Sequence, residues 1–108
     1  MDIVAIKEHF DKEFPREGCG VLAVVKGKKK WFPVTNIAEN PDDFIMDSEE
    51  YIKLSLTTDI IGIVHNHIGN SSEPGQTDKD YCNAMSIPYY IFSYPDMDLT
   101  IVQPETTS

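Results

Sequence analysis

The chain has 108 residues, the size of one domain, and 41% of them are hydrophobic, so a single core can form without disulfide bonds. Its formal net charge of −9 argues against a nucleic-acid-binding protein, because binding to phosphate backbones requires clustered Lys and Arg side chains. No apolar run has the length of a membrane span and the N-terminus lacks the pattern of a secretory signal, so we expect a soluble, cytoplasmic protein without membrane partners.

The first third of the chain predicts a helix followed by a hairpin. Apolar side chains recur at helical spacing through residues 3–14, and Pro15 ends the run. The segments CGVLAVV and KWFPVTNI then have the composition of strands, and the intervening KGKKK, residues 26–30, predicts a hairpin turn. We interpret this lysine cluster as a solvated turn that blunts a sheet edge, which is a commoner use of such a cluster than a binding patch.

The rest of the chain predicts two more helices and three strands. Asp47 opens the second helix, because DSEE has the D-x-x-E form of a capping box. The run IIGIV, residues 60–64, is apolar on both faces and predicts an interior strand. Thr77 is the expected N-cap of a third helix over residues 78–85, and PYYIFSY and LTIVQ are expected strands on either side of the turn PDMD. Together these elements predict an α/β fold in which helices flank a mixed central β-sheet.

Two histidines at the end of the predicted interior strand are the first candidates for a functional site. His65 and His67 are separated by one residue, so in an extended chain both point to the same side. Asp78 follows a Gly- and Pro-containing loop that can fold back toward them. Two imidazoles and one carboxylate form a three-ligand set suited to zinc, with a fourth position left for water. The alternative is that these are ordinary hydrogen-bonded histidines and an aspartate placed for the helix dipole, and on chemistry alone the two interpretations are equally weighted.

The other candidate side chains belong to no such pattern. Cys19 and Cys82 form no C-x-x-C pair, and we expect both to be buried thiols without a disulfide. His9 has no partner nearby in sequence and is expected at the surface of the first helix. Glu17, considered alone, is also expected to be exposed, because Glu is rarely buried.

A longer pattern resembles a known family. HNHIGNSSEPGQTD resembles the H-x-H-x7-S-x-x-D signature of the JAMM metallopeptidases, the JAB or MPN domain family, and aligns His65, His67 and Asp78 with the family's three zinc ligands. FPREGCGVLAVV is similar to the family's N-terminal segment and puts Glu17 at its catalytic position. NIAENPDDFIMDSEEYIKL and CNAMSIPYYIFS resemble the version found in bacteriophage tail-assembly proteins, where this domain often precedes an NlpC-type cell-wall peptidase domain. The resemblance covers nearly the whole chain.

This resemblance implies the JAB/MPN architecture, which is cytidine-deaminase-like, over residues 1–104. Residues 105–108 would then begin a polar linker toward a second domain outside this chain. The resemblance also implies Zn²⁺ as cofactor and hydrolysis of a peptide or isopeptide bond, with Glu17 as general base. The implied partners are a peptide or protein substrate and other phage tail proteins, and the implied location extends to the virion tail. No pattern in the sequence indicates an oligomeric state.

One position departs from the family pattern. The family's serine falls at Gly75, and loss of such an oxyanion-stabilising donor can cost on the order of 100-fold in kcat. The hydroxyls of Ser71, Ser72 or Thr77, or a backbone N–H at Gly75, are the candidates to replace it. The alternative function is therefore a catalytically weak or inactive module that serves as an assembly or docking domain. A zinc deaminase is set aside, because it requires a P-C-x-x-C ligand pair that the sequence lacks.

Overall fold

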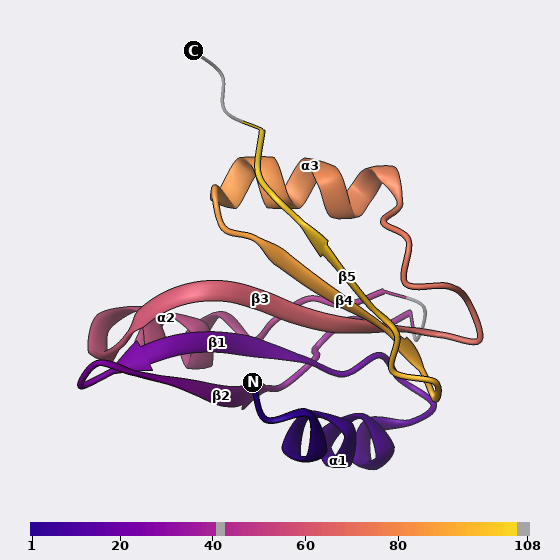
Figure 1. Cartoon of the computed structure of the whole chain (residues 1–108), viewed down its shortest axis with the longest axis horizontal. Coiled ribbons are helices and arrows are strands. Elements are labelled where there is room, and N and C mark those ends of the chain that lie inside the picture. Colours follow the sequence, from indigo (N-terminus) through magenta and orange to yellow (C-terminus); the bar gives the residue numbers. More distant parts are fainter. Residues whose placement is uncertain (41–42, 106–108) are drawn as a thin grey trace.

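The computed structural model describes residues 1–40 and 43–105, and a five-stranded mixed sheet forms its centre (Figure 1). The strand order is β2-β1-β3-β4-β5. The strands are β1 (Cys19–Val25), β2 (Lys28–Val34), β3 (Asp59–Ile68), β4 (Tyr89–Tyr94) and β5 (Leu99–Val102). The helices are α1 (Ile3–Glu13), α2 (Ser48–Thr57) and α3 (Gln76–Met85). The predicted α/β class, with helices flanking a mixed sheet, is confirmed.

Strand β3 is the centre of the sheet, as its continuous apolar run predicted. It pairs antiparallel with β1 and parallel with β4, and α3 forms the crossover that a parallel neighbour requires. The β1–β2 hairpin is also confirmed, with Lys26 and Gly27 both at positive φ in its turn. The second hairpin strand is shorter than the segment 30–37 predicted, because Asn36 leaves the ladder and forms an isolated bridge with Met46.

The core has two parts, one on each face of the sheet. Helix α1 covers one face, where the buried side chains are Ile6, Phe10, Leu22, Val64 and Phe92. Helices α2 and α3 cover the other face, where the buried side chains are Val21, Val34, Ile63, Cys82, Tyr89 and Ile91 (Figure 1). Strand β3 contributes residues to both parts, Ile60 and Ile63 to one and Ile61 and Val64 to the other, which explains why its sequence is apolar at every position from 60 to 64 apart from glycine.

The helix starts agree with the sequence in one case and differ in another. The Asp47 side chain caps α2 by accepting a hydrogen bond from the backbone N–H of Glu50, as predicted. Thr77 was the wrong N-cap for α3, because the helix begins at Gln76 with Gly75 in the cap position. The carboxylate of Asp78 accepts a hydrogen bond from the Gly75 N–H, so this aspartate stabilises the helix start from inside the first turn.

The structure also places the two cysteines, His9 and the start of the C-terminal segment. Cys19 and Cys82 are buried free thiols, as expected. The surface position expected for His9 was wrong: its ring is partly buried and packs edge-on against Trp31, and burial lowers its pKa. Within residues 1–40 and 43–105, no helix combines the length and the apolar character needed to cross a bilayer. Of the linker expected over residues 105–108, only Glu105 lies among the described residues.

The two phenylalanines of the N-terminal segment test the packing of α1. Phe10 is fully buried, whereas Phe14 is 55% exposed. Phe10→Ala should lower the free energy of unfolding by about 3–5 kcal/mol, because it removes a packed ring and leaves a cavity. Phe14→Ala, the matched control, should change it by less than about 1 kcal/mol. Urea unfolding followed by Trp31 fluorescence measures both values, and equal losses would contradict the position of α1 in the core.

Candidate metal centre

Strand β3 extends to Ile68, so both histidines of the H-N-H motif lie within a strand. His65 is in register with Cys19 of β1 on one side and with Ile91 of β4 on the other, which buries its backbone in the middle of the sheet. Because side chains alternate along a strand, His65 and His67 point to the face covered by α3. Asn66, between them, points to the face covered by α1. The sheet therefore fixes both imidazoles on a common side, as predicted.

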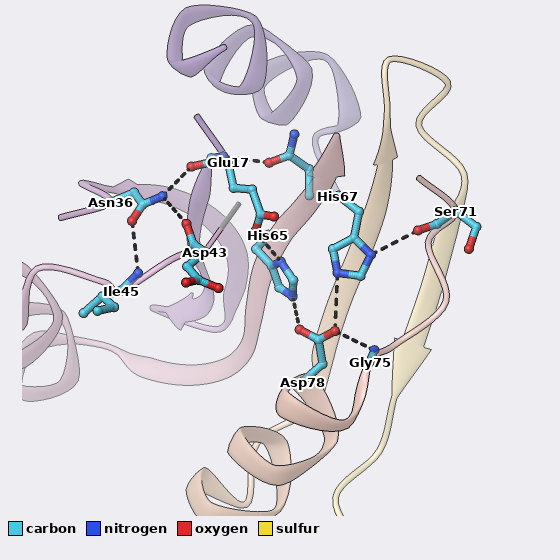
Figure 2. A network of polar contacts seen from close by, with 11 residues as sticks. Glu17, Asn36, Asp43, Ile45, His65, His67, Ser71, Gly75 and Asp78 are labelled. Carbon is cyan, nitrogen blue, oxygen red and sulfur yellow. Dashed lines mark hydrogen bonds and ion pairs between the residues drawn. The ribbon is translucent and has the colours of Figure 1, made fainter. Parts of the chain in front are cut away.

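The loop after β3 returns the chain so that the first turn of α3 lies against the two imidazoles (Figure 2). Asp78 Oδ1 lies 3.0 Å from His65 Nε2, and Asp78 Oδ2 lies 3.3 Å from His67 Nε2. These three residues offer ligand atoms that all lie within 4.8 Å of one another. In tetrahedral zinc sites, bonds of about 2.0–2.1 Å put neighbouring ligand atoms about 3.3 Å apart. The trio is therefore close enough that it could hold a small divalent cation.

The ring nitrogens of His65 provide an independent test of that fit. The residue is 1% exposed, yet neither Nδ1 nor Nε2 makes a hydrogen bond of good geometry to the described residues. Each nitrogen instead faces a carboxylate, Nε2 that of Asp78 and Nδ1 that of Glu17. Buried polar atoms nearly always form good hydrogen bonds, so this arrangement calls for an explanation. A cation held by Nε2 and Asp78 would supply one. The donor set, two imidazoles and a carboxylate, is the one that zinc prefers in sites with an open position.

His67 is oriented by a hydrogen bond on its other ring nitrogen. Its Nδ1 lies 3.0 Å from the backbone carbonyl oxygen of Ser71, so Nδ1 carries the proton and donates (Figure 2). Nε2 then faces Asp78, where it can bear a proton for the carboxylate or, in the neutral ring, offer its lone pair to a cation. Metal-binding histidines usually have such a second hydrogen bond, which fixes both ring orientation and tautomer.

Aromatic rings enclose His65 and hold its rotamer. Phe44 stacks on the imidazole, with ring centroids 4.2 Å apart and an interplanar angle of 23°. Tyr89 contacts the same imidazole edge-on, at a centroid distance of 6.0 Å. These contacts keep water away from the ring, which strengthens the electrostatic interactions of the centre.

The charges of the centre shift its pKa values strongly. Burial alone would lower the pKa of His65, but the carboxylates of Asp78 and Glu17 outweigh burial and raise it. The Asp78 carboxylate likewise raises the pKa of His67, against partial burial. Burial would raise the pKa of Asp78, but the two imidazoles and the Gly75 N–H overcome this and hold it far below its usual range. The same negative potential that favours a proton here also favours a metal cation.

Glu17, in the segment between α1 and β1, lies beside the trio. It is 8% exposed, so the surface position expected from its residue type alone was wrong. Its Oε1 atom lies 3.6 Å from His65 Nδ1, on the opposite edge of the imidazole from Asp78 (Figure 2). The residue that the family resemblance singled out is therefore brought to the same cleft as His65, His67 and Asp78.

The cleft has a volume of about 840 Å³ and opens over these four residues. Four carboxylates belong to its described lining, those of Glu17, Asp43, Glu73 and Asp78. No Lys or Arg is among these lining residues. The apolar part of the lining consists of Phe44, Ile45, Ile68, Pro74 and Tyr81. Such a cleft attracts cations and cationic groups and disfavours anionic ligands.

The hydroxyl groups named as replacements for the family serine differ in their accessibility. Ser71 and Thr77 line the cleft. Ser72 is not part of the lining, and its Oγ is hydrogen-bonded to Oγ1 of Thr100 in β5 at 2.8 Å. The backbone N–H of Gly75 already donates to Asp78 Oδ2 at 2.8 Å. Ser71 and Thr77 therefore remain as side-chain candidates.

Sequence reasoning missed three residues that shape the site: Asn36, Phe44 and Asn66. Asn36 connects segments far apart in the chain, and Phe44 reaches His65 from a loop, so neither had a local signal. Asn66 had a weak one, because it is a polar residue that interrupts a buried apolar strand between two histidines.

Comparisons with known proteins agree with this geometry. Residues 3–102 match the family described as prokaryotic homologs of the JAB domain. The chain is 35% identical over 103 residues to the tail tip assembly protein K of Escherichia phage N15, which covers 94% of this chain and 42% of that protein. The chain thus spans less than half the length of this relative. It is also 27% identical over 100 residues to the CysO-cysteine peptidase of Mycobacterium tuberculosis, covering 85% of this chain and 68% of that protein.

Solved structures show the same fold. A protein from Desulfitobacterium hafniense superposes with a TM-score of 0.73 at 22% identity, covering 94% of this chain and 76% of the other. A JAB1/MPN domain protein from Archaeoglobus fulgidus superposes with a TM-score of 0.63 at 15% identity, covering 93% and 82% of the two chains. At these identities the likeness concerns the architecture alone, and it agrees with the predicted JAB/MPN fold.

Zinc and protons should compete for the imidazoles of the centre. Without zinc, the pKa values of His65 and His67 are raised above 6.5, so their stabilising contribution is complete below pH 6.5 and is lost as pH rises through the raised values. Zinc requires neutral imidazoles, so its contribution grows as pH rises. From about pH 6 to about pH 9, the Tm of the metal-free protein should fall while the increase in Tm caused by zinc becomes larger.

Differential scanning calorimetry with a chelator or with zinc measures both trends. Asp78→Asn should flatten the pH dependence of the metal-free protein and reduce zinc content, because it removes the carboxylate shared by both rings. Asp80→Asn, on the same helix but exposed and bonded to Gln76, is the matched control and should leave both unchanged. A zinc-induced increase in Tm that does not vary with pH would contradict competition between zinc and protons for the imidazoles.

Proposed function

Since the chain belongs to the family of prokaryotic JAB-domain homologues, we propose that it is a zinc-dependent hydrolase of peptide or isopeptide bonds. One observation carries the proposal. A carboxylate from the α1–β1 segment, two imidazoles from β3 and a carboxylate from α3 line a single cleft although they are distant in sequence. Structural ion pairs also bring charged groups together, but they rarely place a buried imidazole between two carboxylates, without hydrogen-bond geometry to either, at the edge of an open cleft.

In this proposal His65, His67 and Asp78 hold the zinc ion, through the two Nε2 atoms and a carboxylate oxygen. Bound zinc would supply a Lewis acid and a water molecule of lowered pKa. The chain itself contributes the orientation of the ligands. The Ser71 carbonyl fixes the tautomer of His67, and Phe44 holds the ring plane of His65.

Glu17 is the general base of the proposed reaction. Its carboxylate would accept the proton of the attacking water and then deliver it to the leaving amine, which a carboxylate within hydrogen-bond reach can do. The position of Oε1 beside His65 Nδ1 supports this role, because it keeps the carboxylate at the cleft wall next to the ligand set. The hydroxyls of Ser71 and Thr77, which line the cleft, are proposed to assist the developing oxyanion.

We further infer that the substrate is a peptide or protein with a basic or neutral face, and that the domain works among phage tail proteins. The four carboxylates of the cleft support the first point. The 35% identity to a tail tip assembly protein, over 94% of this chain, supports the second. In this context residues 1–104 would be the JAB domain of a tail-assembly protein, with residues 105–108 as the start of a linker, in the cytoplasm or on the virion tail.

A second function, a docking or assembly module with little or no turnover, is favoured by Gly75. This residue lacks the hydroxyl that the resemblance leads one to expect, and its N–H is already bonded to Asp78. The two functions differ in the effect that a hydroxyl group added at position 75 would have on kcat.

Glu17→Gln tests the base. The variant should retain zinc but lose at least about 100-fold in kcat, because an amide fills the same space and cannot accept the proton. A pool of quenched-fluorescent peptides with peptide and lysine-isopeptide linkages measures turnover, and elemental analysis measures zinc. Glu8→Gln, exposed on α1, is the control with the same chemical change. Undiminished turnover in Glu17→Gln would remove Glu17 from the role.

Gly75→Ser tests the missing hydroxyl. The backbone of Gly75 has φ of −82°, which any residue adopts, and an added Cβ would meet only Asp78 Oδ2 at 3.7 Å. If the missing donor limits turnover, the variant should raise kcat by about 10-fold or more. Gly75→Ala adds the same Cβ without the hydroxyl and should leave kcat unchanged. Equal kcat values in the two variants would show that the oxyanion is stabilised by other groups.

A further inference from the structure

The peptide unit between Glu17 and Gly18 is held from two sides by side-chain amides. The carbonyl oxygen of Glu17 accepts a hydrogen bond from Nδ2 of Asn36 at 2.8 Å. The N–H of Gly18, in the same peptide unit, donates to Oδ1 of Asn66 at 2.6 Å. Asn36 is 6% exposed and Asn66 is fully buried, so neither bond competes with water. We call this arrangement the amide clamp.

We propose that Asn36 and Asn66 are positioning residues, and that the amide clamp aims the Glu17 carboxylate into the cleft. This inference rests on the proposed function, in which Glu17 is the general base. Glu has three rotatable side-chain bonds, so its carboxylate reaches a defined position only from a fixed backbone. The clamp fixes that backbone, and electrostatic attraction to His65, whose Nδ1 lies 3.6 Å from Oε1, draws the carboxylate toward the cleft wall.

Asn66 links the base to the ligand strand. It is the middle residue of the H-N-H motif, so one short segment of β3 directs His65 and His67 to one face and holds the Glu17 backbone from the other. Its Nδ2 has no hydrogen-bond partner among the described residues, so only its oxygen is used. An unsatisfied buried amide nitrogen destabilises a fold, so the favourable contribution of this side chain comes from its oxygen.

Asn36 links the base to the ring that covers His65. Its side chain donates to the carbonyl oxygens of Glu17 and Asp43 and accepts from the N–H of Ile45 (Figure 2). It also accepts from the N–H of Ala38. The segment from Asp43 to Ile45 carries Phe44, which stacks on His65. The Asn36 amide group therefore helps to position both the backbone of Glu17 and the Phe44 ring that stacks on His65.

The third side of the clamped peptide is closed by α1. A Cβ atom at Gly18 would lie 2.6 Å from Cδ1 of Phe10, so the backbone here lies directly against the buried ring. The peptide is thus fixed by β3, by the loop of Asn36 and by the core. A shift of about 1 Å in a reacting group can cost about 100-fold in rate, which is the effect such a clamp prevents.

The test uses Asn66→Ala and Asn36→Asp. Asn66→Ala removes the acceptor for the Gly18 N–H, and Asn36→Asp removes both donated bonds while keeping an oxygen for Ala38 and Ile45. Each should lower kcat by about 10- to 100-fold with KM within about twofold and zinc content unchanged. Asn83→Ala is the matched control, because its Oδ1 also accepts a backbone N–H, that of Glu105 at 2.7 Å, but lies on α3 and does not line the cleft.

Loss of zinc together with kcat in Asn66→Ala would overturn the proposal, because the residue would then only support the ligand strand. An unchanged kcat would overturn it as well. Hydrogen exchange of the Gly18 amide, measured by NMR on the wild-type protein, tests the hydrogen bond to Asn66 without any assay of turnover. Strong protection that Asn66→Ala abolishes is expected, and free exchange in the wild type would refute the clamp.

A second measurement separates failure of the proposed hydrolase function from failure of the positioning role. If the wild type hydrolyses no probe peptide, the ¹³C resonance of the Glu17 side-chain carboxyl group still reports the surroundings of that group. It should shift in Asn66→Ala and in Asn36→Asp but not in Asn83→Ala. Unshifted resonances in the first two variants would overturn the positioning role, whereas shifts would uphold it in a protein that is not a hydrolase.

Discussion

One carboxylate, that of Asp78, connects the end of the central strand to the start of the crossover helix. It contacts His65 with one oxygen, and with the other it contacts His67 and accepts the N–H of Gly75. The chain between the strand and the helix is thereby closed into a loop at the residue that completes the candidate ligand set. Formation of the β3–α3–β4 unit therefore brings the candidate ligands together, so a cation bound there would stabilise the fold.

The parts of the structure that the sequence predicts are those decided by local chemistry. Alternation along β3 predicted that His65 and His67 share a face, and the loop composition predicted that Asp78 returns to them. The buried position of Glu17 followed only from the family resemblance, because it depends on Asn36, Asn66 and α1, which lie far away in the chain. The start of α3 was misplaced because the T-D-K-D pattern favours Thr77 as a cap. In the structure, the carboxylate of Asp78 instead bonds backward to Gly75.

Most of the buried polar atoms that lack a hydrogen bond belong to the site. Among the described residues these atoms are both ring nitrogens of His65, which face carboxylates without hydrogen-bond geometry, and the amide nitrogen of Asn66, with His9 Nε2 as the one outside the site. An apolar residue at either of the two site positions would pack at lower cost in free energy. Such exceptions are characteristic of functional sites, where position matters more than stability. The prokaryotic JAB-domain architecture supports this arrangement on a sheet whose remaining positions follow ordinary packing rules.

The hydroxyl pair of Ser72 and Thr100 joins the loop that forms one rim of the cleft to the last strand of the sheet. Strand β5 is an edge strand, so one side of its backbone is open to pairing with another chain. A strand of another chain that paired there would reach the rim through the bond between Ser72 and Thr100. Pairing at β5 would then shift the loop at the entrance of the acidic cleft.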